Sequence, residues 1–202
     1  MPLWLAEKPL VLASRSMARQ TLLKAAGIPI EVCPADVDER SLEAAALSVA
    51  PGAIAVHLAR AKASAVAKMR SGRLTLGADQ TLALGAEHFA KPADRMAARA
   101  QLRALRGRTH ELHSAIAFVK DGNVLFEHVG VARLTMRPFS DRFLDLYLDA
   151  AGNAATASVG GYQMESFGIQ LFEHVDGDYF TVLGLPVLPV LEFLRREGYL
   201  AQ

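Results

Sequence analysis

Cysteine is almost absent from this chain, because Cys33 is the only one in 202 residues. A single cysteine excludes an intramolecular disulfide, and it also excludes zinc sites that need two or four thiolates from one chain. The beginning of the sequence lacks a basic segment followed by a long apolar core, so it does not resemble a signal peptide. No uncharged apolar run reaches the length that spans a membrane. We therefore expect a reduced, soluble, cytoplasmic protein with no membrane partner.

Net charge is also small, at +1. The chain therefore has no overall field that would hold a nucleic acid or an anionic membrane, and an anionic ligand must be bound by local charges. Apolar residues make up 51% and charged residues 21%, a balance that excludes disorder and a coiled coil. At this length we expect residues 1–202 to form a single domain, or a single domain with two lobes around a cleft.

Apolar periodicity, caps and turn residues together predict the order of the elements. Strands are predicted at 9–13, 30–33, 109–119, 124–134 and 169–175, and helices at 17–26, 54–69, 95–105, 141–151 and from 186 onward. The signal Lys120-Asp121-Gly122-Asn123 joins two of the strands as a hairpin. Because βα units are mixed with a hairpin, we predict an α/β fold, a mixed sheet with flanking helices.

The stretch from Leu74 to Pro92 contains the strongest candidate for chemistry. An apolar run ends in Asp79, and a second short apolar segment follows at 81–84. A carboxylate at the end of a buried strand is partly desolvated yet meets solvent, which suits a metal ligand or a general base. The alternative is that Asp79 caps a turn whose glycines are Gly77 and Gly85.

A second candidate lies at residues 14–19, where the first predicted strand ends and the first predicted helix begins. Ser14-Arg15-Ser16-Met17-Ala18-Arg19 combines free backbone N–H groups, the positive end of a helix dipole and a guanidinium, which together suit a phosphate. The alternative is an ordinary serine N-cap beside surface arginines. The glycines and the Lys-Ser/Thr ending of a P-loop are absent, and so is the dinucleotide fingerprint.

Three further groups carry weaker signals. Lys62 lies in the alanine-rich helix, where a lysine is ordinarily solvated, and Glu39 ends an acidic loop whose carboxylates face solvent or hold Mg²⁺ or Mn²⁺. His110 and His113 are three apart on a strand and point to opposite faces, so we do not expect a metal site there. The predicted apolar stripe of the helix consists of Leu58, Ala61, Ala65 and Met69.

Seven short motifs occur in one order along the chain. They are Leu12-Ala13-Ser14-x-Ser16-x-x-Arg19-x-x-Leu22-Leu23, Asp36-Val37-Asp38-Glu39, Leu58-Ala59-x-x-Lys62-Ala63, Gly77-Ala78-Asp79, Lys91-Pro92, Gly107-x-x-His110 and Val182-x-Gly184-Leu185-Pro186. In this order they resemble the Maf family of nucleoside triphosphate pyrophosphatases, from about Pro9 to Gly198. The resemblance implies a homodimer with a fold similar to inosine triphosphate pyrophosphatase. It also implies cleavage of a nucleoside triphosphate between the α and β phosphates.

The resemblance also implies roles for individual residues. Asp79 matches the general base, and Glu39 matches a catalytic or metal-binding carboxylate. These two carboxylates are the expected ligands of a divalent cation, Mg²⁺ or Mn²⁺. The residues that match phosphate-binding positions are Ser14, Arg19, Lys62 and Lys91.

Three positions are expected to select the base. Gln80 and Glu165 resemble the branch that acts on 7-methylguanosine triphosphate rather than the pyrimidine-acting branch, which has threonine and glutamine there. A carboxylate accepts the two adjacent donors of a guanine edge, whereas thymine and uracil present one donor between two acceptors. Ala18 stands where the guanine branch usually has an aromatic residue. The alternatives are a thymidine and uridine triphosphate pyrophosphatase, and a non-catalytic nucleotide-binding regulator of septum formation.

Overall fold

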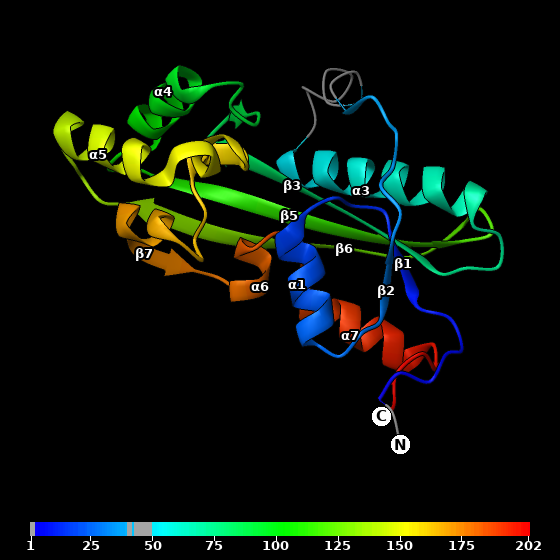
Figure 1. The fold of residues 1–202 in the computed structure, drawn as a ribbon. Coiled ribbons are helices and arrows are strands. Elements are labelled where there is room, and N and C mark those ends of the chain that lie inside the picture. The colour runs from blue at the N-terminus through cyan, green and yellow to red at the C-terminus, as the bar shows by residue number, and fades with distance from the viewer. Residues whose placement is uncertain (1–2, 40–41, 43–49) are drawn as a thin grey trace. The chain divides into compact units, whose positions relative to one another are not determined.

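The computed structural model describes residues 3–39, 42 and 50–202 (Figure 1), and the chain forms two compact units. Unit 1 comprises Met1–Gln80, Ser114–Gly130 and Gly184–Gln202. Unit 2 comprises Thr81–His113 and Val131–Leu183. Because the chain passes between the units several times, each unit is built from segments that are far apart in the sequence.

The described residues form a mixed sheet with flanking helices, so the predicted α/β class is confirmed. The sheet order is β2-β1-β3-β5-β6-β7, with β4 paired to β3. Strand β1 is parallel to β2 and β3, whereas β4 and β7 are antiparallel to their partners β3 and β6. The strands are β1 (Leu10–Leu12), β2 (Ile30–Val32), β3 (Thr75–Leu84), β4 (Glu87–Phe89), β5 (Thr109–Lys120), β6 (Asn123–Met136) and β7 (Phe172–Asp176). The α-helices are α1 (Met17–Ala25), α3 (Pro51–Met69), α4 (Arg95–Leu105), α5 (Asp141–Ala151), α6 (Tyr179–Val182) and α7 (Val187–Arg196).

In unit 1, helices cover both faces of the strands. Alternate residues of β5 point to opposite faces. Ala115, Ala117 and Val119 join the buried alanines of α3, whereas the ring of Phe118 stacks on Phe193 of α7 with centroids 4.2 Å apart. Figure 1 shows α3 and α7 on opposite sides of these strands. The apolar run in β5 is therefore that of a strand buried on both faces.

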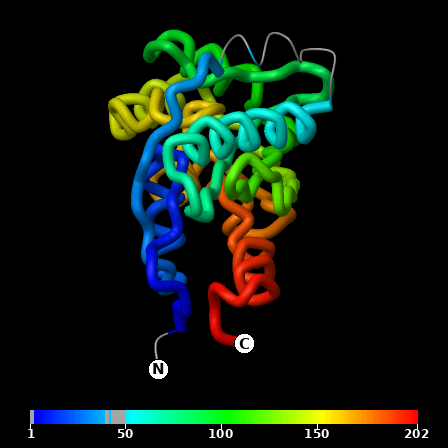
Figure 2. The backbone as a smooth tube through the Cα atoms, turned by 90° about the vertical axis from the view of Figure 1, so that its right-hand side faces the viewer, coloured from blue at the N-terminus to red at the C-terminus, as the bar shows by residue number. Residues whose placement is uncertain are grey.

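Segments near the two ends of the chain lie side by side within unit 1 (Figure 2). Trp4 and Leu200 form an antiparallel bridge. The Leu5 N–H donates to the Tyr199 carbonyl at 2.9 Å, and the ring of Tyr199 lies 6.0 Å from that of Trp4. The segment before β1 is thereby attached to the segment after α7.

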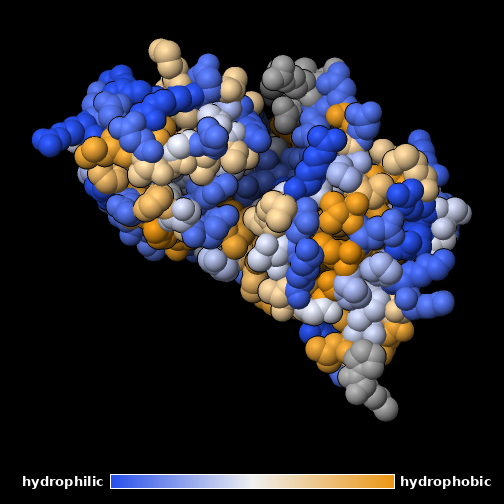
Figure 3. All heavy atoms as spheres, in the orientation of Figure 1, coloured by the Kyte–Doolittle hydropathy of each residue, from blue (hydrophilic) through white to orange (hydrophobic). Residues whose placement is uncertain are grey.

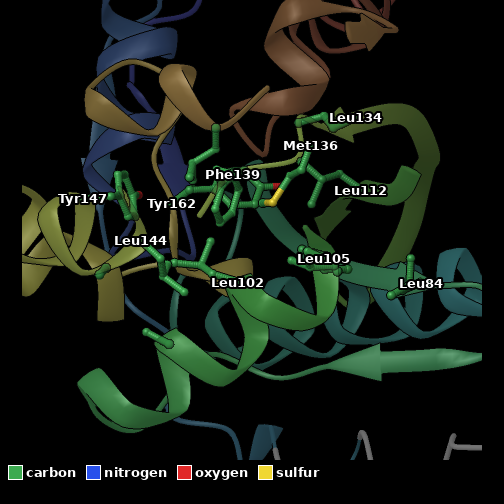
Figure 4. Packing of buried hydrophobic residues seen from close by; sticks show 14 of the residues in the cluster. Leu84, Leu102, Leu105, Leu112, Leu134, Met136, Phe139, Leu144, Tyr147 and Tyr162 are labelled. Atoms are coloured by element: carbon green, nitrogen blue, oxygen red, sulfur yellow. The ribbon is translucent and has the colours of Figure 1, made fainter. Parts of the chain in front are cut away.

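Unit 2 has its own hydrophobic core, in which α4 and α5 pack on the sheet (Figure 4). The helices contribute Leu102, Leu105, Leu144, Tyr147 and Leu148, and the strands contribute Leu82, Leu84, Leu112, Leu134 and Met136. The outward surface of the two helices is mostly hydrophilic (Figure 3) and includes a 2.8 Å ion pair between Arg99 and Asp145. No helix in the described part of the chain is long and apolar enough to cross a membrane.

The predicted caps are confirmed, and one predicted strand is displaced. Asp94 and Ser140 cap α4 and α5, and each side chain accepts a backbone N–H of the first turn. The strand predicted at 169–175 is wrong at its beginning, because Phe167–Leu171 forms a 3₁₀ helix and β7 begins at Phe172. Isolated apolar residues fit both conformations there, and partners elsewhere in unit 2 decide between them. Helix α6 was not predicted, because its four residues are too few for a periodic pattern.

Candidate active site

Asp79 lies in the middle of strand β3, not at its end. The strand runs without a break from Thr75 to Leu84, so the predicted strand end and the alternative turn at Asp79 are both wrong. Gly77 is a strand residue, and only Gly85, with φ of 62°, is a turn glycine. The sequence between the two apolar segments contains no residue that breaks a strand, and the polar side chain of Asp79 is accommodated because a neighbouring helix supplies its partner.

That neighbouring helix, α3, approaches β3 unusually closely at Gly77. A Cβ atom at this position would lie 2.0 Å from the carbonyl oxygen of Ala59 and 2.9 Å from the Cβ of Ala63. Glycine on the strand and alanines on the helix therefore allow the two backbones to approach. Lys62 lies between these alanines on the same buried face of the helix.

The predicted apolar stripe of α3 is wrong in all but one member. Leu58 is buried, but Ala61 and Ala65 are only half-buried and Met69 is 58% exposed. The buried face consists of Ile54, Ala55, Leu58, Ala59, Lys62, Ala63, Val66 and Ala67. Because alanine occurs all around this helix, the spacing of apolar residues does not define which face packs. The expectation that Lys62 is solvated is wrong for the same reason.

The ammonium group of Lys62 bridges two carboxylates. Its Nζ lies 2.6 Å from Asp79 Oδ1 and 3.0 Å from Glu39 Oε1. The lysine and the aspartate are 8% and 7% exposed, whereas the Glu39 side chain is half exposed. Burial raises the pKa of Asp79, and the cations Lys62 and Arg19 partly oppose this shift. The carboxylate at the centre of the site is therefore both desolvated and electrostatically compensated.

Arg19 brings a second buried cation to the same site. Its Nε donates to the Gly184 carbonyl at 2.8 Å, and its Nη1 donates to the Ala78 carbonyl at 2.7 Å and to Ser14 Oγ at 3.1 Å. Burial lowers the pKa of Arg19, while Asp79 and Glu39 raise it, and a guanidinium stays protonated in this balance. Arg19 thus ties the beginning of α1 to the residue that precedes Asp79. Its contact with phosphate stays a prediction.

The structure confirms the serine cap in the segment from Ser14 to Arg19, and phosphate binding there stays a prediction. Ser16 is an N-cap, and its Oγ accepts the Arg19 N–H at 3.4 Å, as the simpler alternative predicts. Ser14, however, is buried beside the Arg19 guanidinium rather than placed on a free surface. A helix cap needs neither a buried serine nor a buried arginine, so the burial of these two residues next to Asp79 is not explained by capping.

Gln80 is oriented by a neighbour that the sequence did not single out. Its Nε2 donates at 2.9 Å to the hydroxyl of Ser114, a fully buried residue of β5. Gly184, with φ of 88°, lies beside both side chains, and a Cβ atom there would be in ordinary contact, 3.6 Å from Gln80 Oε1 and from Arg19 Nε. A polar residue in an otherwise apolar strand was the available signal for Ser114, and a glycine inside a strand was the signal for Gly77.

The predicted site residues divide between the units. Ser14, Ala18, Arg19, Glu39, Lys62, Asp79 and Gln80 belong to unit 1, where the contacts above bring all but Ala18 to one place. Ala18 is half-buried on α1. Lys91 is exposed in the segment between β4 and α4, and Glu165 is exposed on a turn; both belong to unit 2.

The two histidines of β5 have different partners in unit 2. His110 Nε2 lies 2.7 Å from the hydroxyl of Tyr162, and His113 Nε2 lies 3.0 Å from Glu111 Oε2. Burial lowers the pKa of His110 to about 4, so its imidazole is neutral near pH 7. Across the residues that the structure describes, no three His, Cys, Asp or Glu side chains form a group that could hold a metal.

Comparison with known proteins assigns the chain to a family. The model of the family described as "Maf-like protein" matches residues 9–197. A protein of Rhodopseudomonas palustris named nucleoside triphosphate pyrophosphatase is 57% identical over 201 residues, which cover 100% of both chains. A protein of Mesorhizobium japonicum named 7-methyl-GTP pyrophosphatase is 52% identical over 191 residues, 94% of this chain and 96% of the relative. The motifs, the mixed α/β sheet and these full-length similarities lead to one conclusion: the chain belongs to the Maf family.

Proposed function

We propose that this chain is a nucleoside triphosphate pyrophosphatase with 7-methyl-GTP as its preferred substrate and a divalent cation as its cofactor. The observation that carries the proposal is the buried Lys62, whose ammonium group forms ion pairs with both Asp79 and Glu39. It combines a candidate base, a positive charge for phosphates and a second carboxylate in one place. Relatives that are 57% and 52% identical carry the names of such enzymes.

In this mechanism Asp79 is the general base. It accepts a proton from a water molecule whose oxygen forms a bond to the α phosphorus. The bond from that phosphorus to the bridging oxygen breaks, and pyrophosphate leaves with the electron pair. Burial raises the pKa of Asp79, which strengthens it as a base, while the nearby cations Lys62 and Arg19 oppose that shift by favouring the ionised form. Activity should therefore fall as the pH drops through a pKa that lies above the ordinary value of 3.8.

The positive charges of unit 1 have a second task in this proposal. A triphosphate brings several negative charges to a protein whose net charge is only +1. Lys62 and Arg19 are preorganised by their hydrogen bonds, so they offset this charge without reorganising during the reaction. Lys91, exposed in unit 2, is proposed as a further phosphate contact.

The donor set of unit 1 fits Mg²⁺ or Mn²⁺. These ions prefer oxygen ligands, and Mg²⁺ is commonly bound by one or two carboxylates together with substrate phosphates. Asp79 and Glu39 offer two such carboxylates, and both lie beside the Lys62 ammonium, at 2.6 and 3.0 Å. A bound divalent ion would neutralise phosphate charge and polarise the phosphoryl group.

One assay tests activity, substrate and metal together. The purified protein is incubated with a panel of nucleoside triphosphates, including 7-methyl-GTP, thymidine triphosphate and uridine triphosphate, with Mg²⁺ or Mn²⁺, and pyrophosphate is measured. We expect the highest kcat/KM with 7-methyl-GTP and complete loss of activity with a chelator. Because the ion serves the substrate rather than the core, the chelator should leave the melting temperature of the free protein unchanged. Absence of pyrophosphate with every substrate would contradict the enzyme assignment and favour a binding role.

Glu165 is the proposed base-selecting carboxylate, and its replacement has a defined consequence. Glu165→Gln should weaken the preference for 7-methyl-GTP over thymidine triphosphate by roughly 1–3 kcal/mol, because an amide cannot accept both donors of the guanine edge. The measurement is the ratio of kcat/KM for the two substrates. Glu173→Gln, another exposed glutamate of unit 2, is the matched control and should leave the ratio unchanged. An unchanged ratio in an active Glu165→Gln variant would remove Glu165 from base selection.

A further inference from the structure

Glu165 projects from a turn that is closed on itself. The Ser166 N–H donates to the Gln163 carbonyl at 3.2 Å, which closes the turn on the two sides of Glu165. Gly168 lies so close that a Cβ atom there would be 2.3 Å from the Gln163 carbonyl oxygen. Glu165 itself is exposed. The backbone beneath this carboxylate is therefore tightly packed although the side chain faces solvent.

The residues immediately before the turn are anchored by three side chains. Tyr162 is buried, and its hydroxyl lies 2.7 Å from His110 Nε2. Ser158 Oγ donates to the Tyr162 carbonyl at 2.6 Å, and the Tyr147 hydroxyl donates to the Gly161 carbonyl at 3.0 Å. Both tyrosine rings belong to the hydrophobic core of unit 2 (Figure 4). The core thus holds the backbone on which the Glu165 turn begins.

His110 contributes to this anchor at a cost in free energy. It is 1% exposed, and its Nδ1 has no hydrogen-bond partner within the described parts of the chain. A buried polar atom without a partner is unfavourable, and an apolar residue would avoid that cost. Burial also lowers the pKa of His110 to about 4, so the imidazole meets Tyr162 in its neutral form. The hydrogen bond to Tyr162 is the interaction that an apolar residue could not replace.

We propose that His110, Tyr162 and Tyr147 are positioning residues that fix the turn and thereby set the base selectivity of Glu165. The inference rests on the proposed function, in which Glu165 recognises the base. A side chain whose backbone is already held in one place loses less freedom when it binds, whereas one on a mobile backbone must be ordered at a greater cost in affinity. Selection between bases therefore depends on hydroxyl and imidazole groups that do not touch the substrate.

The test is Tyr162→Phe, which removes the hydroxyl and keeps the ring. We expect KM for 7-methyl-GTP to rise and its kcat to stay nearly constant. The ratio of kcat/KM between 7-methyl-GTP and thymidine triphosphate should fall by about three- to tenfold, the effect of one neutral hydrogen bond. Tyr179→Phe, at an exposed tyrosine of unit 2, is the matched control and should change neither constant.

A double-mutant comparison separates positioning from a general effect on structure. In the Glu165→Gln background, Tyr162→Phe should leave the substrate ratio unchanged, because the carboxylate that it positions is absent. An equal fall of the ratio in both backgrounds would overturn the proposal. If Tyr162→Phe does not fold, Ser158→Ala, which removes the hydroxyl that donates to the Tyr162 carbonyl, is measured in the same two backgrounds.

Hydrogen exchange tests the anchor without any substrate. The Ser166 amide, which donates to the Gln163 carbonyl, should exchange faster in Tyr162→Phe than in the wild type, and at the wild-type rate in Tyr179→Phe. Unchanged protection in Tyr162→Phe would overturn the anchoring step. If the wild type hydrolyses no triphosphate, the proposed function fails, and the exchange rates still decide whether these residues hold the turn.

Discussion

Asp79→Asn should lower kcat by roughly 10²–10⁴-fold, the usual contribution of a general base. An amide cannot accept the proton of the attacking water, but its oxygen can still accept the Lys62 hydrogen bond that Asp79 Oδ1 accepts at 2.6 Å. Glu39, whose Oε1 lies 3.0 Å from the same ammonium, remains as its salt-bridge partner. We therefore expect the variant to fold and to bind the triphosphate while losing most turnover.

Steady-state kinetics with 7-methyl-GTP and a thermal melt measure this result. Asp121→Asn makes the same chemical change in the β5–β6 turn, where the side-chain oxygen accepts the Gly72 N–H at 2.6 Å and an amide oxygen can do the same. That control should retain wild-type kcat. A wild-type rate in Asp79→Asn would exclude Asp79 as the base, whatever the behaviour of the control.

Gly77→Ala should be severe although glycine has no side chain to take part in the reaction. The added Cβ would lie 2.0 Å from the Ala59 carbonyl oxygen, a backbone atom that cannot rotate away. Helix α3 must then move from β3, which we expect to lower the free energy of unfolding by about 3 kcal/mol. Because Lys62 lies on that helix, its distance from Asp79 should increase. A displacement of ~1 Å at an active site can reduce the rate by about 10²-fold.

Chemical denaturation and kcat together test this expectation. Gly27→Ala is a useful comparison, because a Cβ at Gly27 meets nothing within 4 Å and the only penalty is the positive φ of 73°. It should lower stability by about 1–2 kcal/mol and leave kcat unchanged. If Gly77→Ala matched the wild type in both measurements, close approach of α3 to β3 would not be what places Lys62.

Local sequence signals were sufficient to place the elements that begin at a clear cap residue or follow a clear turn. Asp94 and Ser140 occur as N-caps before periodic segments, and Asp121-Gly122 is a hairpin turn with positive φ at both residues. These features act through neighbours within a few residues, so the amino-acid sequence is sufficient to place them. The mixed α/β class followed from the order of such elements.

The phase of α3 and the continuity of β3 were decided only by tertiary structure. Alanines surround the helix, so the pattern did not show that Lys62 rather than Met69 faces the core. Asp79 interrupts an apolar run in the sequence, yet the strand continues because the buried Lys62 compensates its charge. The two residues of this ion pair lie on different elements, so no local sequence pattern predicts that they meet.

The same distinction holds for the groups around the candidate base. The motifs named Arg19 and Gln80, but their orientation depends on Gly184 and Ser114, which arrive from distant segments of unit 1. The Tyr162 anchor in unit 2 likewise depends on His110, a residue 52 positions earlier. Sequence determined which chemical groups are available to this protein. Packing decided which of them are buried, paired and held, because burial and hydrogen bonding depend on contacts that form only when distant segments fold together.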